Sequence, residues 1–331
     1  MAKVLVTGGS GFVGNNLARC LLILGHGVSL LLRDSYAKWR VNDICRDVEI
    51  HIADLCDEVA VCRIVKKIRP DWVFHLAAHG AYSSQTDVMR ILRSNVIGTA
   101  TLVQACMKTG FEAFVNTGSS SEYGFKDHPP AEKEWLEPNS YYAVAKASAT
   151  LFCRHTALAS GLRIPTLRLY SVYGPYEEPS RLMPTLILRG FKNELPPLVA
   201  PHIARDYVYI DDVVQAFLLA ATGEKQELGA VYNVGTGVQT SLREVVDVAC
   251  HTLGIAAEPK WSSMENRIWD TGTWVSDHRC IEQQLGWRPE FTFEQGFRTM
   301  VDWFKQNPAM IDVYRKRLDD TTVQRDHPRP A

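Results

Sequence analysis

The feature that most limits the fold of this chain is a glycine-rich loop directly after its first apolar run. The run "KVLVT" (residues 3–7) has the length and β-branched residues of a buried strand, and "GFVGNNLARCLLILG" continues as a helical pattern. Gly8, Gly11 and Gly14 stand between them at GxxGxxG spacing. Such a loop lets backbone N–H groups at a helix N-terminus approach a pyrophosphate. We therefore expect a dinucleotide to bind here.

Strand-length apolar runs keep alternating with helical stretches through the first half of the chain. The expected strands include "VSLLL", "VEIHI", "DWVFHLA", "EAFVNTG" and "LRIPTLRL", and "EVAVCRIVKKI" and "VIGTATLVQACMKTG" are expected helices. Because a parallel strand needs a crossover, this order predicts a Rossmann-type, doubly wound parallel sheet over residues 1–174. Residues 175–310 are expected to form a smaller mixed α/β substrate lobe, with the chain free to cross between the two. The polar residues 311–331 are expected to be a frayed tail.

Composition excludes several kinds of partner. The 331 residues carry a net charge of −1 and no run of basic residues, so we expect neither a nucleic acid nor a membrane as partner. No secretory signal precedes the first strand, and the eight cysteines occur singly, without a CxxC pair. This usage is typical of reduced thiols in a cytoplasm, and no metal site is expected.

The end of the second expected strand should show which dinucleotide binds. An acidic side chain there accepts a hydrogen bond from the ribose 2′-OH of NAD, whereas a cation suits the phosphate of NADP. Arg33 comes first, and Lys38 and Arg40 follow closely, which favours NADP(H). NAD(H) remains possible, with Asp34 as the ribose ligand. After the third strand, Asp54 and Leu55 are placed to approach the adenine, although an acid there could equally cap a helix.

A tyrosine and a lysine in "NSYYAVAK" (residues 139–146) form a second candidate site. Tyr142 precedes Lys146 by four residues, about one helical turn, so their side chains share a helix face that Tyr141 does not. Tyrosine ordinarily has a pKa of about 10, and a nearby lysine cation favours the phenolate. Such a tyrosine can exchange a proton with a sugar oxygen while a nicotinamide moves a hydride. A serine after the preceding strand, among residues 119–121, could hold the same oxygen.

Together these motifs resemble the extended short-chain dehydrogenase/reductase family, in its nucleotide-sugar epimerase, dehydratase and reductase branch. The resemblance covers about residues 3 to 305. It rests on "TGGSGFVG", "VFHLAAHGA", "NVIGT", "SSSEYG", "YYAVAK", "RLYSVYGP", "RDYVYIDDV", "YNVGTG" and "LGWRP".

The resemblance implies a role for each matching residue. Tyr142 and Lys146 match the catalytic pair, and Ser119 matches the catalytic Ser/Thr, five residues before Gly124. The positions that match cofactor contacts are Phe12 and Val13 in the glycine loop, Leu76, Ala77 and Ala78 after the fourth strand, Asn95 as a structural asparagine, and Val172 near the nicotinamide. Arg205 and Arg267 match positions that grip the nucleotide diphosphate, where a guanidinium can bridge two oxygens. The family also implies a homodimer that pairs through two helices of each subunit.

Departures from the family pattern narrow the reaction. Dehydratases usually carry an acidic pair after the Ser/Thr, but Ser120 and Ser121 stand there, and Glu122 comes one place too late. Ser171 replaces the usual asparagine. The sugar is expected to meet these three serines and a distinctive segment after the fourth strand, which contains His79, Tyr82, Ser83 and Ser84. A structural role is an equal alternative for His79.

Two redox reactions remain open at this stage. Arg33 favours an NADPH-dependent reductase that acts at C4 of an NDP-4-keto-6-deoxyhexose, with Tyr142 as general acid. An NDP-sugar 4-epimerase with tightly bound NAD is the main alternative. A 4,6-dehydratase or decarboxylase is a further one. A cofactor-sensing protein without catalysis is the alternative from another class, against which the intact set of Ser119, Tyr142 and Lys146 argues.

Overall fold

The computed structural model of the protein describes residues 1–82, 85–265 and 271–326, with residues 319–326 described by their backbone alone. Its strands are β1 (Lys3–Thr7), β2 (Gly27–Leu32), β3 (Glu49–Ile52), β4 (Trp72–His75), β5 (Ala113–Ser119), β6 (Thr166–Leu169), β7 (Ser171–Tyr173), β8 (Ala204–Arg205), β9 (Tyr207–Tyr209), β10 (Val231–Val234) and β11 (Thr240–Ser241). Its α-helices are α1 (Phe12–Ile23), α2 (Glu58–Ile68), α3 (Val88–Leu92), α4 (Gly98–Thr109), α5 (Tyr141–Ser160), α6 (Leu182–Gly190), α7 (Ile210–Thr222), α8 (Leu242–Leu253), α9 (Arg279–Leu285), α10 (Phe293–Gln306) and α11 (Pro308–Asp326). Two 3-10 turns, η1 (Lys38–Arg40) and η3 (Ser120–Tyr123), and a π-helical turn, η2 (Arg93–Ile97), complete the described elements.

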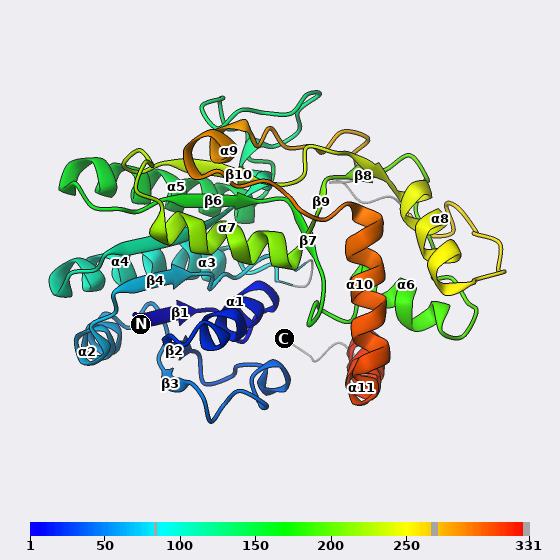
Figure 1. The fold of residues 1–331 in the computed structure, drawn as a ribbon, viewed down its shortest axis with the longest axis horizontal. Coiled ribbons are helices and arrows are strands. Elements are labelled where there is room, and N and C mark those ends of the chain that lie inside the picture. Colours follow the sequence, from blue (N-terminus) through cyan, green and yellow to red (C-terminus); the bar gives the residue numbers. More distant parts are fainter. Residues whose placement is uncertain (83–84, 266–270, 327–331) are drawn as a thin grey trace.

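Seven strands form one parallel sheet in the order β10-β6-β5-β4-β1-β2-β3 (Figure 1). Helices α1 and α7 pack together on one side of it, and α2, α4 and α5 pack on the other. This arrangement confirms the expected doubly wound α/β fold. The carboxyl ends of β1, β4 and β5 meet at one edge, which is where ligands of such sheets bind.

The alternation of side chains along each strand produces the two faces. In β1, Val4 and Val6 join the core under α1 and α7, whereas Leu5 joins the core under α2 and α4. Phe114 and Val115 of β5 divide in the same way. Both faces are buried, which explains why these strands read as continuous apolar runs in the sequence.

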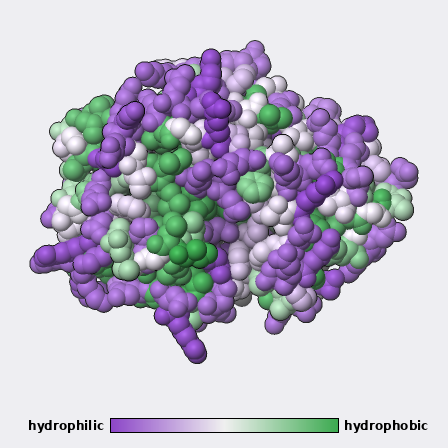
Figure 2. Space-filling view, viewed as in Figure 1, coloured by the Kyte–Doolittle hydropathy of each residue, from purple (hydrophilic) through white to green (hydrophobic). Residues whose placement is uncertain are grey.

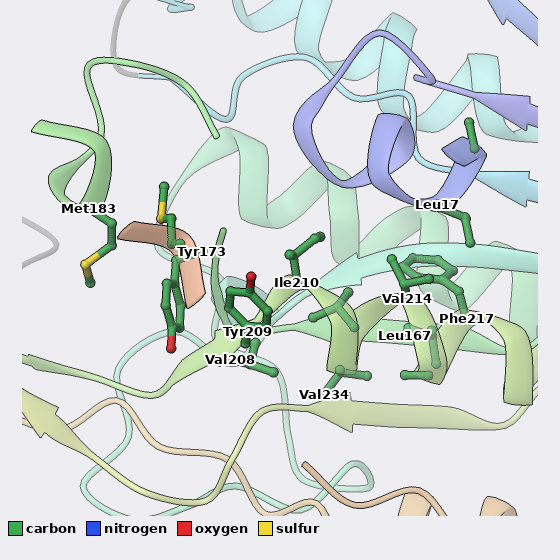
Figure 3. Packing of buried hydrophobic residues seen from close by; sticks show 14 of the residues in the cluster. Leu17, Leu167, Tyr173, Met183, Val208, Tyr209, Ile210, Val214, Phe217 and Val234 are labelled. Carbon is green, nitrogen blue, oxygen red and sulfur yellow. The ribbon is translucent and has the colours of Figure 1, made fainter. Parts of the chain in front are cut away.

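The core under α1 and α7 continues into the smaller lobe. Figure 3 shows Leu17 of α1 and Phe217 of α7 in the same cluster as Tyr173, Met183 and Tyr209, which lie beyond the main sheet. Two short sheets, β7-β9 and β11-β8, form the transition to the lobe of α6, α8 and α10. Because one core runs through both parts, it holds the two sides of the candidate site in a fixed relation.

The chain crosses between its two parts, as the expected division allowed. Although α7 and β10 lie after residue 174, α7 covers the main sheet and β10 pairs with β6 in it. The frayed tail expected from residue 311 is wrong as far as residue 326, because these residues continue helix α11. Tyr314 anchors this helix, since it is fully buried and its ring lies 4.9 Å from that of Phe304 and 5.4 Å from that of Trp39.

The surface is mainly polar with local apolar areas. Figure 2 shows a mostly hydrophilic face that is interrupted by an apolar strip in the region of α1 and α7. Within the described part of the chain, no helix has the length and apolar character needed to cross a membrane.

Candidate active site

The glycine loop after β1 is a cradle with no room for side chains. Gly8 has a φ of +72°, and a Cβ there would lie 2.6 Å from the backbone nitrogen of Ala77. A Cβ on Gly14 would lie 2.4 Å from the carbonyl oxygen of Gly8. Helix α1 starts behind this loop at Phe12, and no side chain among the described residues caps its first N–H groups. These free donors and the helix dipole fit a dinucleotide pyrophosphate, with Phe12 and Val13 in the first turn.

A buried chain of hydrogen bonds fixes residues 76–78, which follow β4 and form the wall that faces the glycine loop. Thr99 donates its hydroxyl proton to the carbonyl of Asn95, so it must accept from Nε2 of His75. Nδ1 of His75 then accepts from the Thr7 hydroxyl, which itself accepts from the N–H of Ala77. Burial lowers the pKa of His75 to about 3, so the imidazole stays neutral and this order of donors holds. The backbone of residues 76–78 is thereby set against the glycine loop.

Asn95 holds the next residue of this wall. Its amide accepts from the N–H of His79 at 2.8 Å and donates to the carbonyl of His79 at 2.7 Å. The structural role expected for Asn95 matches this geometry. The His79 side chain is itself buried, and its Nδ1 has no hydrogen-bond partner among the described residues. Burial and the nearby Arg90 cation lower the pKa of His79.

The residues expected to bind the adenosine end of the dinucleotide differ in whether their side chains are exposed or already bonded within the fold. Arg33 and Asp34 are exposed just after β2, and no hydrogen bond or ion pair joins the Arg33 side chain to any residue that the structure describes. Arg40 is buried instead, and it donates to the Glu178 carboxylate at 3.0 Å and to the carbonyl of Tyr176 at 2.7 Å. The side chain of Arg40 is therefore engaged in contacts within the protein.

The two residues expected near the adenine differ in exposure. Asp54 accepts from the N–H of Cys56 in its own turn, and Leu55 is buried against α4, where it contacts the position of Gly98. The helix cap at this point is Asp57, whose side chain accepts from the N–H of Ala60. Asp54 thus forms a turn rather than a cap.

Ser119, Tyr142 and Lys146 come together where β5 ends beside the start of α5. Ser140 caps this helix, so its first turn presents Tyr142 inward while Tyr141 remains 62% exposed. Lys146, one turn further, is buried, and its Nζ donates to the carbonyl of Thr117 at 2.8 Å. The geometry agrees with the helical-face argument that separates the two tyrosines.

The protonation states of this pair differ from the expectation. Burial raises the pKa of Tyr142 to about 12, and the charge of Glu122 acts in the same direction, while a hydrogen bond with Ser119 opposes them. Burial lowers the pKa of Lys146 to about 8. We expected the Lys146 cation to lower the pKa of Tyr142, and this expectation is wrong. The Nζ of Lys146 faces Thr117 and lies 6.0 Å from the Tyr142 ring centroid. Tyr142 therefore holds its proton at neutral pH, as a general acid must.

The three serines expected at the sugar have different surroundings. Ser121 shares a hydrogen bond with the Ser119 hydroxyl at 2.8 Å, so it lies beside the candidate catalytic group. Ser120 is buried and accepts from the indole of Trp274 at 3.2 Å. Ser171 lies in β7, where its N–H donates to the carbonyl of Asp206, and its neighbour Val172 pairs with β9.

The substrate lobe supplies cations to the same edge of the sheet. Arg205 donates to the carbonyl of Ala204 and stacks over the ring of Trp274 at 5.5 Å. Arg181, which the sequence did not single out, lies 5.1 Å from the ring centroid of Tyr82 and donates to the carbonyl of Ala81. Both Arg181 and Tyr82 affect the pKa of Tyr142, which places them near the candidate acid. Ser83, Ser84 and Arg267 lie outside the described residues.

The sequence did not indicate that two carboxyl groups near this site are buried. Glu122 is fully buried and pairs with Arg168 of β6 at 2.8 Å, so it does not face a substrate. Glu177 is buried beside Arg181 with one oxygen unpartnered among the described residues, and burial raises its pKa to about 8. The sequence signal for Glu177 is its place in "YGPYEEPSRLMP" (residues 173–184), a stretch rich in proline.

Comparisons with known proteins agree with this site. The model of the NAD dependent epimerase/dehydratase family matches residues 4–235. The chain is 29% identical to dTDP-glucose 4,6-dehydratase 1 of Escherichia coli K12, with 98% of this chain and 99% of the relative covered. It also resembles the solved UDP-glucose 4-epimerase of Thermotoga maritima with UDP-glucose, at 28% identity and a TM-score of 0.82, over 92% of this chain and 99% of that one.

A third relative carries a cofactor. The UDP-glucose 4-epimerase of Thermus thermophilus, solved as a complex with NAD, is 30% identical, with a TM-score of 0.80 over 91% of this chain and 98% of that one. The family model spans the glycine loop, the wall at β4 and the Ser119, Tyr142 and Lys146 positions. The chain therefore belongs to the NAD dependent epimerase/dehydratase family of enzymes, which confirms the resemblance seen in its sequence.

Proposed function

We propose that this chain is an NADPH-dependent reductase of a nucleotide-diphosphate 4-keto-6-deoxyhexose. The observation that carries the choice of cofactor is Arg33. Its guanidinium is exposed at the end of β2, free of partners among the described residues, at the position that decides between NAD and NADP. A 2′-phosphate there would gain a charge-assisted bond without breaking an existing one.

The residues at the β5 edge suit the addition of a proton to a C4 ketone. When bound, the nicotinamide supplies the hydride that adds to C4. Tyr142, still protonated, gives its proton to the C4 oxygen, and Ser119 orients that oxygen through its hydroxyl. Lys146 lies one turn further along α5, where its Nζ donates to the carbonyl of Thr117 beside the end of β5. Hydride and proton together convert the ketone into an alcohol.

Among the described residues, this edge carries no acids at the two positions after the catalytic serine that dehydratases use for the elimination of water. Serines stand at positions 120 and 121, where the dehydratases usually carry an acidic pair. Glu122 cannot substitute for them, because its carboxylate is sealed against Arg168 and Thr150. These two features argue against the dehydratase alternative for this chain.

An NDP-sugar 4-epimerase is the second candidate. Relatives of this chain support it, since the Thermus thermophilus UDP-glucose 4-epimerase is solved with NAD. In this case Asp34, exposed next to Arg33, accepts the ribose 2′-OH of a tightly held NAD. Ser119, Tyr142 and Lys146 then serve both removal and return of the hydride.

We also propose that the protein is a homodimer. Helix α5 bears a stripe of exposed positions at 141, 144, 151, 155 and 158, with the half-buried position 148 between them, which is the spacing of one helical face. Within it, Val144, Leu151 and Leu158 are 40%, 58% and 57% exposed. A cavity of about 790 Å³ opens beside the stripe and is lined partly by Trp135 and Leu151. A partner helix on this stripe would bury the apolar residues.

Titration of both cofactors tests the choice between reductase and epimerase. Replacing Arg33 by Ala should weaken NADPH binding about 10 to 100-fold, the loss of one charge-assisted hydrogen bond of about 1.5–3 kcal/mol, and leave NADH binding nearly unchanged. Asp34→Ala is the matched control, and it should not weaken NADPH binding. Equal losses for both cofactors in Arg33→Ala, or a wild-type preference for NADH, would instead support the epimerase.

A further inference from the structure

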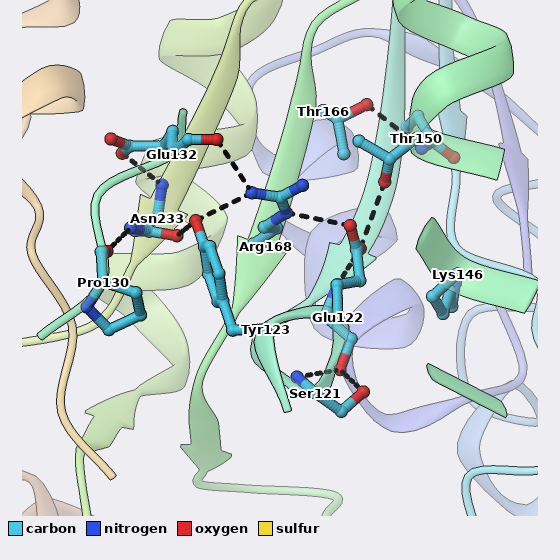
Figure 4. Close-up of polar contacts among 12 residues, drawn as sticks. Ser121, Glu122, Tyr123, Pro130, Glu132, Lys146, Thr150, Thr166, Arg168 and Asn233 are labelled. Carbon is cyan, nitrogen blue, oxygen red and sulfur yellow. Dashed lines mark hydrogen bonds and ion pairs between the residues drawn. The ribbon is translucent and has the colours of Figure 1, made fainter. Parts of the chain in front are cut away.

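Glu122 is a fully buried carboxylate that lies beside the candidate catalytic residues and takes no part in the chemistry described above. Its Oε1 accepts from the N–H of Ser119 at 2.8 Å and from the Thr150 hydroxyl at 3.1 Å. Its Oε2 accepts from Nε of Arg168 at 2.8 Å (Figure 4). One side chain thus joins the end of β5, helix α5 and strand β6.

Further hydrogen bonds hold the arginine of this ion pair in place. Arg168 is 2% exposed, and its Nη1 donates to the Tyr123 hydroxyl and to the carbonyl of Glu132. The Tyr123 hydroxyl in turn donates to the side chain of Asn233 in β10. Breaking a buried pair of this kind leaves an uncompensated charge, so the contacts of Glu122 are held tightly.

We propose that Glu122 is a positioning residue for the site formed by Ser119, Tyr142 and Lys146, an inference that rests on the function proposed above. The carboxylate fixes the backbone of Ser119 through the capping box of η3. Through Thr150 it fixes the helix that carries Tyr142 and Lys146. It also supplies a buried negative charge that faces both of these residues.

The electrostatics of Lys146 support this role. Burial lowers the pKa of Lys146, and the charge of Glu122 is the first of the influences that raise it again, followed by Cys153. Among the described residues, the other titratable group tied to it is His75, whose imidazole stays neutral because burial and the Lys146 cation both lower its pKa. Removal of the Glu122 charge should therefore move the titration of Lys146 to lower pH.

Removal of the Glu122 charge should lower the pKa of Tyr142 as well. Burial and the Glu122 charge raise its pKa, as does Tyr82 to a smaller extent, while Arg181 and the hydrogen bond from Ser119 lower it. Without the charge of Glu122, the phenol should lose its proton more easily. In a reductase that needs the protonated phenol, the loss of activity at high pH should then begin at a lower pH than in the wild type.

The test is Glu122→Gln, which keeps the shape and the acceptor for Ser119 and Thr150. Lysine side-chain NMR of labelled protein, with Lys146→Arg to assign the signal, measures the titration of Lys146 without turnover. We expect this titration at lower pH than in the wild type, together with a loss of about 10 to 100-fold in kcat/KM, as for one charge-assisted hydrogen bond. An unchanged Lys146 titration would overturn the proposal.

Two further variants separate charge from packing. Thr150→Val removes one hydrogen bond and keeps the carboxylate, so it should leave the Lys146 titration where it is. An equal shift in Thr150→Val would contradict the role of the charge.

Glu122→Gln combined with Arg168→Gln avoids an unpaired arginine if the single variant does not fold. Arg168 is not among the charges that shift the pKa of Lys146 or Tyr142, so the double variant should show the same direction of shift.

The two proposals can fail separately. If the wild type turns over no NDP-sugar with either cofactor, the proposed function is wrong, and the NMR titration still decides the role of Glu122. If the wild type is active and Lys146 titrates identically in Glu122→Gln, the positioning role is wrong and the reductase proposal stands.

Discussion

At the scale of single residues, burial decides the state in which Tyr142 works. The half-buried phenol lies between the end of β5 and the first turn of α5, where loss of solvent disfavours its charged form and raises its pKa to about 12. The neighbouring Tyr141 extends into solvent from another face of the same helix. The two adjacent tyrosines thus form a natural comparison.

Replacing Tyr142 by Phe should reduce turnover of the nucleotide sugar by about 10² to 10⁴-fold, the usual contribution of a general acid, and should leave cofactor affinity unchanged. Tyr141→Phe removes a hydroxyl on the exposed side and is the matched control. Steady-state kinetics and cofactor titration of both variants provide the measurement. A larger loss in Tyr141→Phe than in Tyr142→Phe would reverse the assignment.

Local spacing in the sequence predicted part of this site and could not predict the rest. The four-residue interval between Tyr142 and Lys146 is a property of one helix, so it is visible in the chain. The partner of Glu122 is Arg168, 46 residues away in a different strand, and only the sheet brings the two together. The raised pKa of Tyr142 also depends on burial, which a neighbouring lysine in the sequence does not reveal.

At the scale of elements, the C-terminal helix α11 supports the loop that follows β2. Its buried Tyr314 packs edge-on against Trp39 of η1 and against Phe304 of α10. Trp39 in turn lies 4.1 Å from the guanidinium carbon of Arg40, which joins this loop to Glu178. The helix therefore contributes to the shape of the region in which Arg33 is carried.

Tyr314→Ala should lower the free energy of unfolding by about 3–5 kcal/mol, as expected when a buried aromatic side chain is removed. Chemical unfolding of the variant measures the loss. Phe125→Ala, at a position that is 47% exposed, is the control and should cost much less. Similar stability of Tyr314→Ala and the wild type would show that α11 does not pack as described.

The elements of the sheet were predictable because two buried faces leave long apolar runs, as in "KVLVT" and "EAFVNTG". Helix α11 was not, because most of its sequence, as in "YRKRLDD", is polar. The buried Tyr314 holds it against other parts of the chain, with Met310, Ile311 and Leu318 packed against the same core. The return of β10 to the main sheet was similarly hidden, since a four-residue strand carries no mark of its partner.

At the scale of the whole molecule, the exposed stripe on α5 predicts how two copies pair. Replacing Leu151 and Leu158 by Arg should convert the dimer into a monomer, because two charges would be buried at the interface. Sedimentation at micromolar concentration measures the change. Ile23→Arg, at an 85% exposed position on α1 on the other side of the sheet, is the control and should remain a dimer. A monomeric wild type, or dissociation only in Ile23→Arg, would exclude pairing through α5.

The central claim is that the chain moves hydride from NADPH to C4 of a nucleotide-linked keto sugar. The direct measurement uses NADPH deuterated at the transferring carbon, on each face in turn, with an NDP-4-keto-6-deoxyhexose as substrate. The account predicts that NADPH is consumed in equal amount with substrate and that one of the two labelled forms leaves a single deuterium at C4 of the product. Interconversion of C4 epimers without NADPH consumption, or loss of water from an NDP-hexose, would contradict it.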